Sequence, residues 1–257
     1  MQNRSKILYK AALTVGMVRW SIVFLLWKVS VKMPEIIFNG PEGRLEGRYQ
    51  QGKSDTAPIA LILHAHPQYG GTMNAKVCYN LFHLFAQRGF SVLRFNFRGV
   101  GRSQGEFDNG IGELSDAASA LDWLQGFNPN ASSCWVAGFS FGAWIGMQLL
   151  MRRPELSGFI SVAPPANLYD FSFLAPCPSS GLIVHGSQDE IVEADSAKKL
   201  AEKLQAQRAI TVDYDEIKGA GHFFEDHLDK MVTSVDSYLT KRLTAGISAP
   251  TGKRTGR

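Results

Sequence analysis

Apolar and polar positions alternate along the chain in blocks that predict strands and helices in turn. Short apolar runs predict strands, and longer stretches with helical spacing predict helices. The predicted strands are 35–39, 44–50, 58–65, 91–97, 133–137, 158–162, 182–185 and 210–217. The predicted helices are 74–87, 112–125, 141–152, 196–207 and 225–242. Strands that alternate with helices predict an α/β fold, in which helices cover both faces of a mostly parallel sheet.

The same pattern predicts one domain, residues 33–243, between two ends of different character. Residues 1–32 contain an apolar stretch that Arg19 interrupts, which leaves too little length to cross a bilayer, and no A-x-A cleavage pattern follows. We expect an extension outside the functional protein, with translation starting at Met33. A membrane-surface anchor and a targeting segment are the alternatives. Residues 244–257, rich in Gly, Pro, Ser and Thr, are expected to form a disordered basic tail.

The net charge of +4 also belongs to the ends of the chain. Residues 1–32 contain six basic side chains and residues 243–257 contain three, with no acidic residue in either, so residues 33–242 carry a net charge of about −5. A mildly acidic domain argues against nucleic acid as a partner.

Three cysteines without C-x-x-C spacing favour a reduced, cytoplasmic protein. They are Cys78, Cys134 and Cys177.

One motif carries candidate chemistry: Gly138-Phe139-Ser140-Phe141-Gly142 lies between a predicted strand and a predicted helix. A serine in this context fits the nucleophile elbow of a serine hydrolase. The turn is so sharp that the positions two before and two after the serine must lack side-chain bulk. We therefore expect Ser140 to be a catalytic nucleophile.

A nucleophilic serine needs a base and an acid that orients the base. In a parallel sheet these residues lie in loops after the carboxyl ends of strands. His222, in a glycine-rich loop between the last strand and the last helix, is the predicted base. Asp189, after the preceding strand, is the predicted acid, and Asp170 is the alternative. His83 and His227 fall within predicted helices and are expected to be packing or surface residues.

The developing oxyanion needs two N–H donors. His64-Ala65-His66-Pro67 and the following Gly70-Gly71 come directly after the first long strand, where an oxyanion loop belongs. We expect the backbone amides of His66 and Phe141 to form the oxyanion hole, since Pro67 has no N–H. His64 is expected to support this loop, and His185, at a strand end, to support the site from behind.

Together, these segments and the run Arg94-Phe95-Asn96-Phe97-Arg98-Gly99-Val100-Gly101-Arg102-Ser103 resemble the α/β-hydrolase superfamily. Within it, the chain is similar to small bacterial hydrolases related to dienelactone hydrolases and acyl-peptidase catalytic domains. Over about 35–242, the resemblance implies an eight-stranded, mostly parallel sheet and a Ser-Asp-His triad. Two features of this sequence differ from the pattern of related hydrolases. Dienelactone hydrolases have cysteine where Ser140 stands, and residues 163–181 are too few for a large lid domain.

Three other interpretations are weaker. Residues 98–103 contain G-x-G after a strand, but no helix opens there, so a tight turn is favoured over a dinucleotide-binding loop. His64 and His66 could form a metal pair of an amidohydrolase-type enzyme, but further ligands would have to come from the triad. A catalytically silent binding protein of the same fold would be expected to lack a triad residue.

We therefore predict a cofactor-free, metal-free serine hydrolase that cleaves carboxylic esters, thioesters or related acyl compounds through an acyl-Ser140 intermediate. Its partner is a small acyl substrate. Membrane contact is expected only if residues 1–32 are retained, and a homo-oligomer and peptidase activity are left open. The run Phe171-Ser172-Phe173-Leu174 is expected either to line the acyl pocket or to cover the core.

Overall fold

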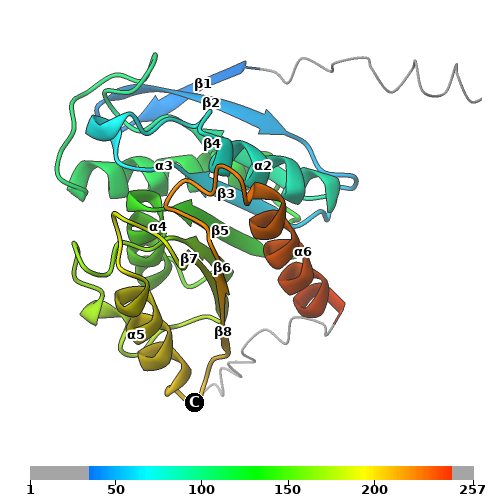
Figure 1. Cartoon of the computed structure of the whole chain (residues 1–257). Helices are drawn as coiled ribbons and strands as arrows, with labels where there is room; N and C mark the ends of the chain where they lie inside the picture. The colour runs from blue at the N-terminus through cyan, green and yellow to red at the C-terminus, as the bar shows by residue number, and fades with distance from the viewer. Residues whose placement is uncertain (1–34, 245–257) are drawn as a thin grey trace, which may run out of the picture. The chain divides into compact units, whose positions relative to one another are not determined.

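The computed structural model describes residues 35–244 (Figure 1). The predictions for residues 1–32, the start at Met33 and the tail beyond Thr244 lie outside these residues. The eight strands are β1 (Glu35–Gly40), β2 (Gly43–Gln50), β3 (Ile59–Leu63), β4 (Ser91–Phe95), β5 (Cys134–Phe139), β6 (Leu156–Val162), β7 (Gly181–Gly186) and β8 (Val212–Ile217). The helices are α2 (Lys76–Gln87), α3 (Ile111–Phe127), α4 (Phe141–Arg152), α5 (Ala194–Gln205) and α6 (Leu228–Thr244), with short 3-10 helices η1 (Pro67–Tyr69) and η2 (Ser172–Leu174).

The strands form one sheet in the order β1-β2-β4-β3-β5-β6-β7-β8. β2 is antiparallel to both β1 and β4, and all other neighbours are parallel. This arrangement confirms the predicted eight-stranded, mostly parallel sheet. Every residue of β3, β4, β5 and β7 is buried, as expected for strands covered on both faces.

The helices lie in two layers (Figure 1). α2 and α6 contact each other on one face of the sheet, while α3 and α4 contact each other on the other face, which α5 also covers. α4 packs on β3, β5 and β6, so it lies at the middle of the sheet. Its first residue follows directly after Ser140. The central strand and the central helix therefore meet at the candidate nucleophile.

The segment between β6 and β7 contains only the short helix η2. Phe171 and Leu174 are buried in it, and the partly buried Phe173 packs against the core. The Phe171–Leu174 run therefore covers the core rather than standing free beside the site. As predicted, the segment forms no large lid.

Two element ends differ from the sequence-based predictions in informative ways. The strand predicted over 58–65 ends at Leu63, because the His64 side chain replaces the strand ladder by accepting a hydrogen bond from the Phe97 amide (3.0 Å). The helix predicted over 225–242 begins only at Leu228. His227, predicted to be helical, lies in the turn before α6, where its amide donates to the Phe224 carbonyl (2.9 Å).

Parallel strands bring their carboxyl ends to one edge of the sheet. The segments after β3, β4, β5, β6, β7 and β8 therefore converge there, although they span more than half of the chain.

Within residues 35–244, no helix has both the length and the apolar composition needed to cross a membrane.

Candidate active site

Ser140 sits at a turn whose backbone is locked on both sides. Its φ of 54° and ψ of −119° are rare for a residue with a side chain. The Ser140 amide donates to the Val162 carbonyl in the neighbouring strand (2.8 Å), and its carbonyl accepts from the Ala143 amide in the first turn of α4 (2.8 Å). These contacts hold the serine in a strained conformation between β5 and α4.

The flanking glycines are required by close backbone approaches. A Cβ on Gly138 would lie 2.2 Å from the Gly142 carbonyl oxygen. A Cβ on Gly142 would lie 2.4 Å from the Leu63 oxygen and 2.5 Å from the His64 oxygen. Real Cβ atoms do not approach backbone atoms so closely, so the start of α4 can pack against the end of β3 only with glycine here.

The structure joins three of the predicted site residues in one hydrogen-bonded chain. His222 Nε2 lies 3.0 Å from Ser140 Oγ, and His222 Nδ1 lies 2.8 Å from Asp189 Oδ2. Asp189 is an acceptor when ionised, so Nδ1 carries the proton, and Nε2 is left to accept the serine proton. Asp170, the alternative acid, is instead exposed, and its carboxylate accepts from the Ser172 amide and hydroxyl (2.8 and 2.6 Å).

The Asp189 carboxylate is buried but well supplied with donors. Its Oδ1 accepts from the amides of Ile191 and Val192 (2.9 and 2.8 Å). Burial alone disfavours the charge, but the hydrogen bonds from His222 and the Val192 amide outweigh it, and the pKa of Asp189 is lowered. The stabilisation from this carboxylate is therefore present above its ordinary pKa and is lost as the pH falls through the lowered value.

His185 lies against the Asp189 loop, as its place at a strand end predicted. It is fully buried, and its Nε2 donates to the Val192 carbonyl (2.9 Å) and lies 3.5 Å from Asp189 Oδ2. Burial lowers the pKa of His185, so the ring is neutral. Among residues 35–244, no group pairs with its Nδ1.

The two predicted oxyanion donors are backbone amides at element starts. Phe141 opens α4, and His66 precedes the first residue of η1. No hydrogen bond between the described residues uses either amide. Both are therefore free to bind an acceptor brought in by a substrate.

His64 is held by the backbone through both ring nitrogens. Nδ1 donates to the Ala65 carbonyl (2.7 Å), while Nε2 accepts from the Phe97 amide (3.0 Å). Burial lowers the pKa of His64 to about 4, so it is a neutral support for the loop. His66 Nδ1 meanwhile accepts from the Gln68 amide (3.2 Å). These geometries do not fit a metal pair. Within residues 35–244, no three His, Cys, Asp or Glu side chains are arranged to hold a metal ion.

Residues 98–103 form a structural turn, as the sequence favoured. Arg98 makes a buried bidentate ion pair with Asp116, with Nε–Oδ2 and Nη2–Oδ1 distances of 3.0 and 2.8 Å. Ser103 Oγ donates to the Asn96 carbonyl (2.6 Å) and accepts from the Glu46 amide (3.0 Å). The Ser103 hydroxyl is therefore fully used in tying this turn to β2.

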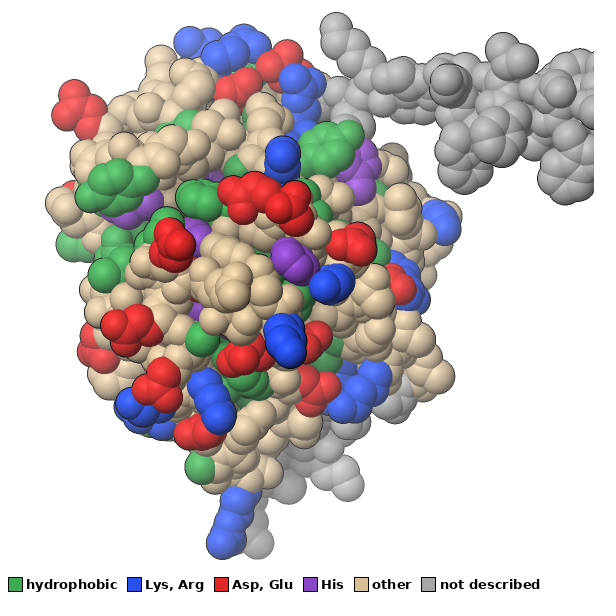
Figure 2. Space-filling view, viewed as in Figure 1, with side chains coloured by type: hydrophobic (Ala, Val, Ile, Leu, Met, Phe, Trp, Pro, Cys, Tyr) green, Lys and Arg blue, Asp and Glu red, His purple; other side chains and the backbone are tan. Residues whose placement is uncertain are grey.

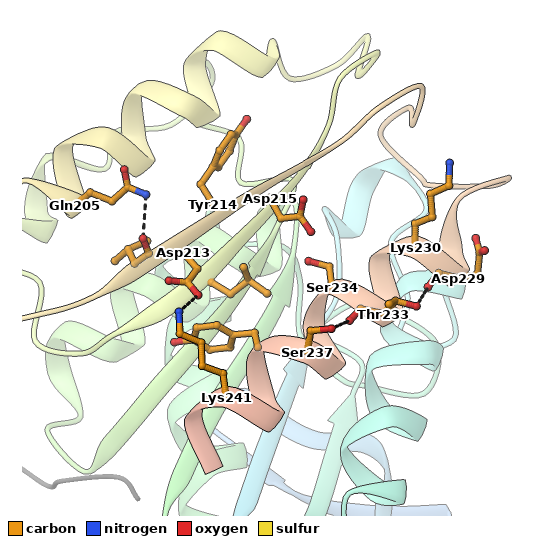
Figure 3. A pocket seen from close by; sticks show the side chains of 13 residues that line it. Gln205, Asp213, Tyr214, Asp215, Asp229, Lys230, Thr233, Ser234, Ser237 and Lys241 are labelled. Carbon is orange, nitrogen blue, oxygen red and sulfur yellow. Dashed lines mark hydrogen bonds and ion pairs between the residues drawn. The ribbon is translucent and has the colours of Figure 1, made fainter. Parts of the chain in front are cut away.

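Two hollows of about 740 Å³ each lie on the surface of the described residues. One is beside His222 and Asp189, between the loops after β7 and β8. The other is a groove between the edge strand β8 and α6 (Figure 3). Lys241 Nζ contacts Asp213 Oδ2 (2.9 Å) in this groove. None of Ser140, His222 and Asp189 lines this groove. His222 and Asp189 line the first hollow, which is therefore the candidate site.

The aromatic side chains near the serine were not predicted from the sequence. Trp144 lies four residues after Ser140, a spacing that places it one helical turn away and could have identified it. Its indole stacks on Tyr169 from the segment after β6, with centroids 4.3 Å apart. No local signal in the sequence predicts that contact.

The fold and the site together define an α/β hydrolase of the serine-hydrolase class without a large lid. The family described as X-Pro dipeptidyl-peptidase (S15 family) matches residues 47–238. The chain belongs to this family.

Similar proteins fall in the same broad class of α/β hydrolases. The crystal structure of the Agrobacterium tumefaciens protein ATU1826 is 60% identical in sequence, covers 83% of this chain and 98% of its own, and has a TM-score of 0.81. XC6422 from Xanthomonas campestris, a serine hydrolase without a lid, is 30% identical over 82% of this chain and 95% of its own, with a TM-score of 0.74. The lysophosphatidylserine lipase ABHD12 of Bos taurus is 25% identical in an alignment 209 residues long that covers 65% of this chain and 50% of that protein.

We predict opposite effects for two glycine-to-alanine changes. Gly142→Ala forces a methyl group into the Leu63 and His64 carbonyls, so it should lower the free energy of unfolding by about 2 kcal/mol or more and displace Ser140. A methyl group on Gly126, in α3, would instead point into open space, with no neighbouring atom within 4 Å. Gly126→Ala should therefore be neutral or stabilise by up to about 1 kcal/mol. Urea unfolding of both variants tests this, and equal effects would contradict the packing described here.

A second prediction concerns His64. Because its folded-state pKa is lowered to about 4, the unfolded chain binds more protons between pH 6.5 and 4, and stability falls as the pH falls through this window. The expected loss attributable to His64 is about 2 kcal/mol between pH 7 and 5. NMR titration of the folded protein should show a neutral His64 ring at pH 5. A protonated ring at that pH would contradict the buried geometry.

Proposed function

We propose that the protein hydrolyses carboxylic esters through an acyl-Ser140 intermediate, with thioesters and related acyl compounds as further substrates. The observation that carries the proposal is the hydrogen-bonded chain from Ser140 Oγ through His222 to the buried Asp189 carboxylate. The serine at the start of this hydrogen-bonded chain has a strained backbone conformation, and the backbone amides of Phe141 and His66 are unused. Such an arrangement can deliver a nucleophile, a base and oxyanion donors to one carbonyl group.

In the first half of the proposed reaction, Ser140 Oγ bonds to the carbonyl carbon while its proton passes to His222 Nε2. The carbonyl oxygen becomes an oxyanion and accepts from the amides of Phe141 and His66. Asp189 keeps the proton on His222 Nδ1 and stabilises the imidazolium. Collapse of the intermediate breaks the bond to the leaving group, which takes the proton from Nε2. An acyl-Ser140 ester and a free alcohol result.

The second half repeats these steps with water. His222 Nε2 accepts a proton from water as the water oxygen bonds to the acyl carbon. The second tetrahedral intermediate collapses, Ser140 regains its proton from Nε2, and the carboxylic acid leaves. All groups return to their starting state without a cofactor.

Relatives support ester cleavage in different degrees. ABHD12 is named a lipase, and XC6422 is named a serine hydrolase. The family description names a dipeptidyl-peptidase, so amide cleavage is the competing activity to measure. The open hollow beside His222 and the absence of a large lid among the described residues favour a small or exposed acyl substrate.

We also propose that the enzyme acts in the cytoplasm. Cys78, Cys134 and Cys177 are all free and buried, and burial raises the pKa values of Cys78 and Cys134 to about 12. Inert, unpaired thiols suit a reducing compartment. The acidic balance of residues 33–242 supports a small molecule rather than nucleic acid as the partner.

Substitution of the serine tests the proposal. Ser140→Ala removes the nucleophile and should lower kcat for p-nitrophenyl acetate or butyrate by about 10⁵- to 10⁶-fold. Ser237→Ala makes the same chemical change on the exposed face of α6 and should leave kcat within twofold. A Xaa-Pro-p-nitroanilide should be cleaved far more slowly than either ester. If the kcat of Ser140→Ala stays within tenfold of the parent value, Ser140 is not the nucleophile. If the parent enzyme prefers the anilide to the esters, the proposed esterase activity is wrong and the protein is a peptidase.

A further inference from the structure

Ser140 has two chemically different flanks, and the inference drawn from them rests on the proposed hydrolysis. On one flank, four partly exposed rings surround the buried Phe141 ring; we call them the aromatic wall. They are His66, Phe107, Trp144 and Tyr169, with centroids 5.0, 6.0, 5.6 and 6.0 Å from that of Phe141. They come from the segments after β3, β4, β5 and β6. In Figure 2 hydrophobic and histidine side chains gather on the upper left of the molecule.

Trp144 is the residue of the wall that belongs to the same helix start as the candidate nucleophile. It lies one turn into α4, and its amide contacts the Ser140 carbonyl (3.3 Å). Side chains of a helix lean toward its N-terminus, which places the indole over the turn that contains Ser140.

The orientation of this indole is fixed from three sides. Its Nε1 donates to the Asp170 carbonyl (3.2 Å), and its face stacks on Tyr169. Its edge lies so close to Gly110 that a Cβ there would be 2.4 Å from the ring. A partly exposed tryptophan held so firmly is a preformed apolar surface, since no side-chain entropy is lost when a ligand covers it.

The other flank is polar. The hollow beside His222 is lined by Gln188, Glu190 and Glu225, which are exposed, together with Ile191 and Phe223. His222 Nε2 must protonate the leaving group, so the leaving group has to lie on the His222 side. The acyl group then lies on the opposite side of the carbonyl carbon, against the wall. This wall includes His66 and surrounds Phe141, the two residues whose backbone amides are the proposed oxyanion donors.

We propose that the aromatic wall is the acyl-binding subsite, and that the enzyme's substrates are esters of apolar carboxylic acids larger than acetic acid with polar alcohols. Trp144 is the specificity-determining residue. The acyl group covers the indole and the Tyr169 ring, while the alcohol leaves through the hollow beside His222. Burial of extra methylene groups or an aryl ring on this surface strengthens binding in the transition state and raises kcat/KM with acyl size.

The test compares p-nitrophenyl acetate, hexanoate, octanoate and benzoate, which share one leaving group. In the parent enzyme, kcat/KM should rise at least tenfold from acetate to octanoate or benzoate. Trp144→Ala should lower kcat/KM for the larger esters about 10- to 50-fold and for acetate less than threefold. Trp144→Phe should recover most of the preference. Trp123→Ala removes an indole of α3, away from the wall, and should leave the ratio between esters unchanged.

The outcomes separate this inference from the proposed function. If no ester is cleaved and Ser140 does not react with a fluorophosphonate, the proposed hydrolysis fails. If acetate is cleaved through Ser140 but kcat/KM does not rise with acyl size, the acyl subsite is not at the wall. A uniform loss for all four esters in Trp144→Ala would give Trp144 a structural role only and overturn its assignment as the specificity-determining residue.

Discussion

The close approach of α4 to the end of β3 is the constraint on which the site depends. Gly142 lies against the Leu63 and His64 carbonyls, so the helix begins within van der Waals contact of the neighbouring strand. At this turn Ser140 has a positive φ of 54°. The same turn leaves the Phe141 amide unused and brings the first turn of α4, including Trp144, to the edge of the sheet. The proposed nucleophile, one proposed oxyanion donor and the proposed acyl surface thus follow from one packing contact.

The electrostatics of the site depend on which buried groups stay neutral. Burial lowers the pKa values of His64 and His185, and backbone carbonyls hold their protons on defined nitrogens. Asp189 is ionised because His222 and two amides compensate its burial. The ionised Asp189 carboxylate therefore pairs with His222, while His64 and His185 stay uncharged. This arrangement fixes the imidazole tautomer, and in the proposed mechanism it stabilises the imidazolium that forms when Ser140 loses its proton.

Much of this architecture could be predicted from the sequence because its signals are local. Apolar runs of strand length, helical spacing and the glycines around Ser140 indicated the order of elements, and strand ends indicated where His222 and Asp189 should lie. Contacts between segments that lie far apart in the sequence could not be predicted from local patterns. The sequence favoured Asp189 over Asp170 as the acid, but only the structure shows that Asp189 reaches His222 and that the Asp170 carboxylate accepts from Ser172. The stacking of Trp144 on Tyr169 joins segments that no local pattern relates. His64 ended a strand early because its side chain, and not the backbone, satisfied the Phe97 amide.

The central claim is that Ser140 is an activated nucleophile. Labelling of the full-length protein with a fluorophosphonate, followed by mass spectrometry of its peptides, tests it most directly. The account predicts a single adduct on Ser140 that is absent from Ser140→Ala and from protein unfolded by heat before labelling. A folded protein that forms no adduct, or that reacts at another serine such as Ser103, would contradict the account.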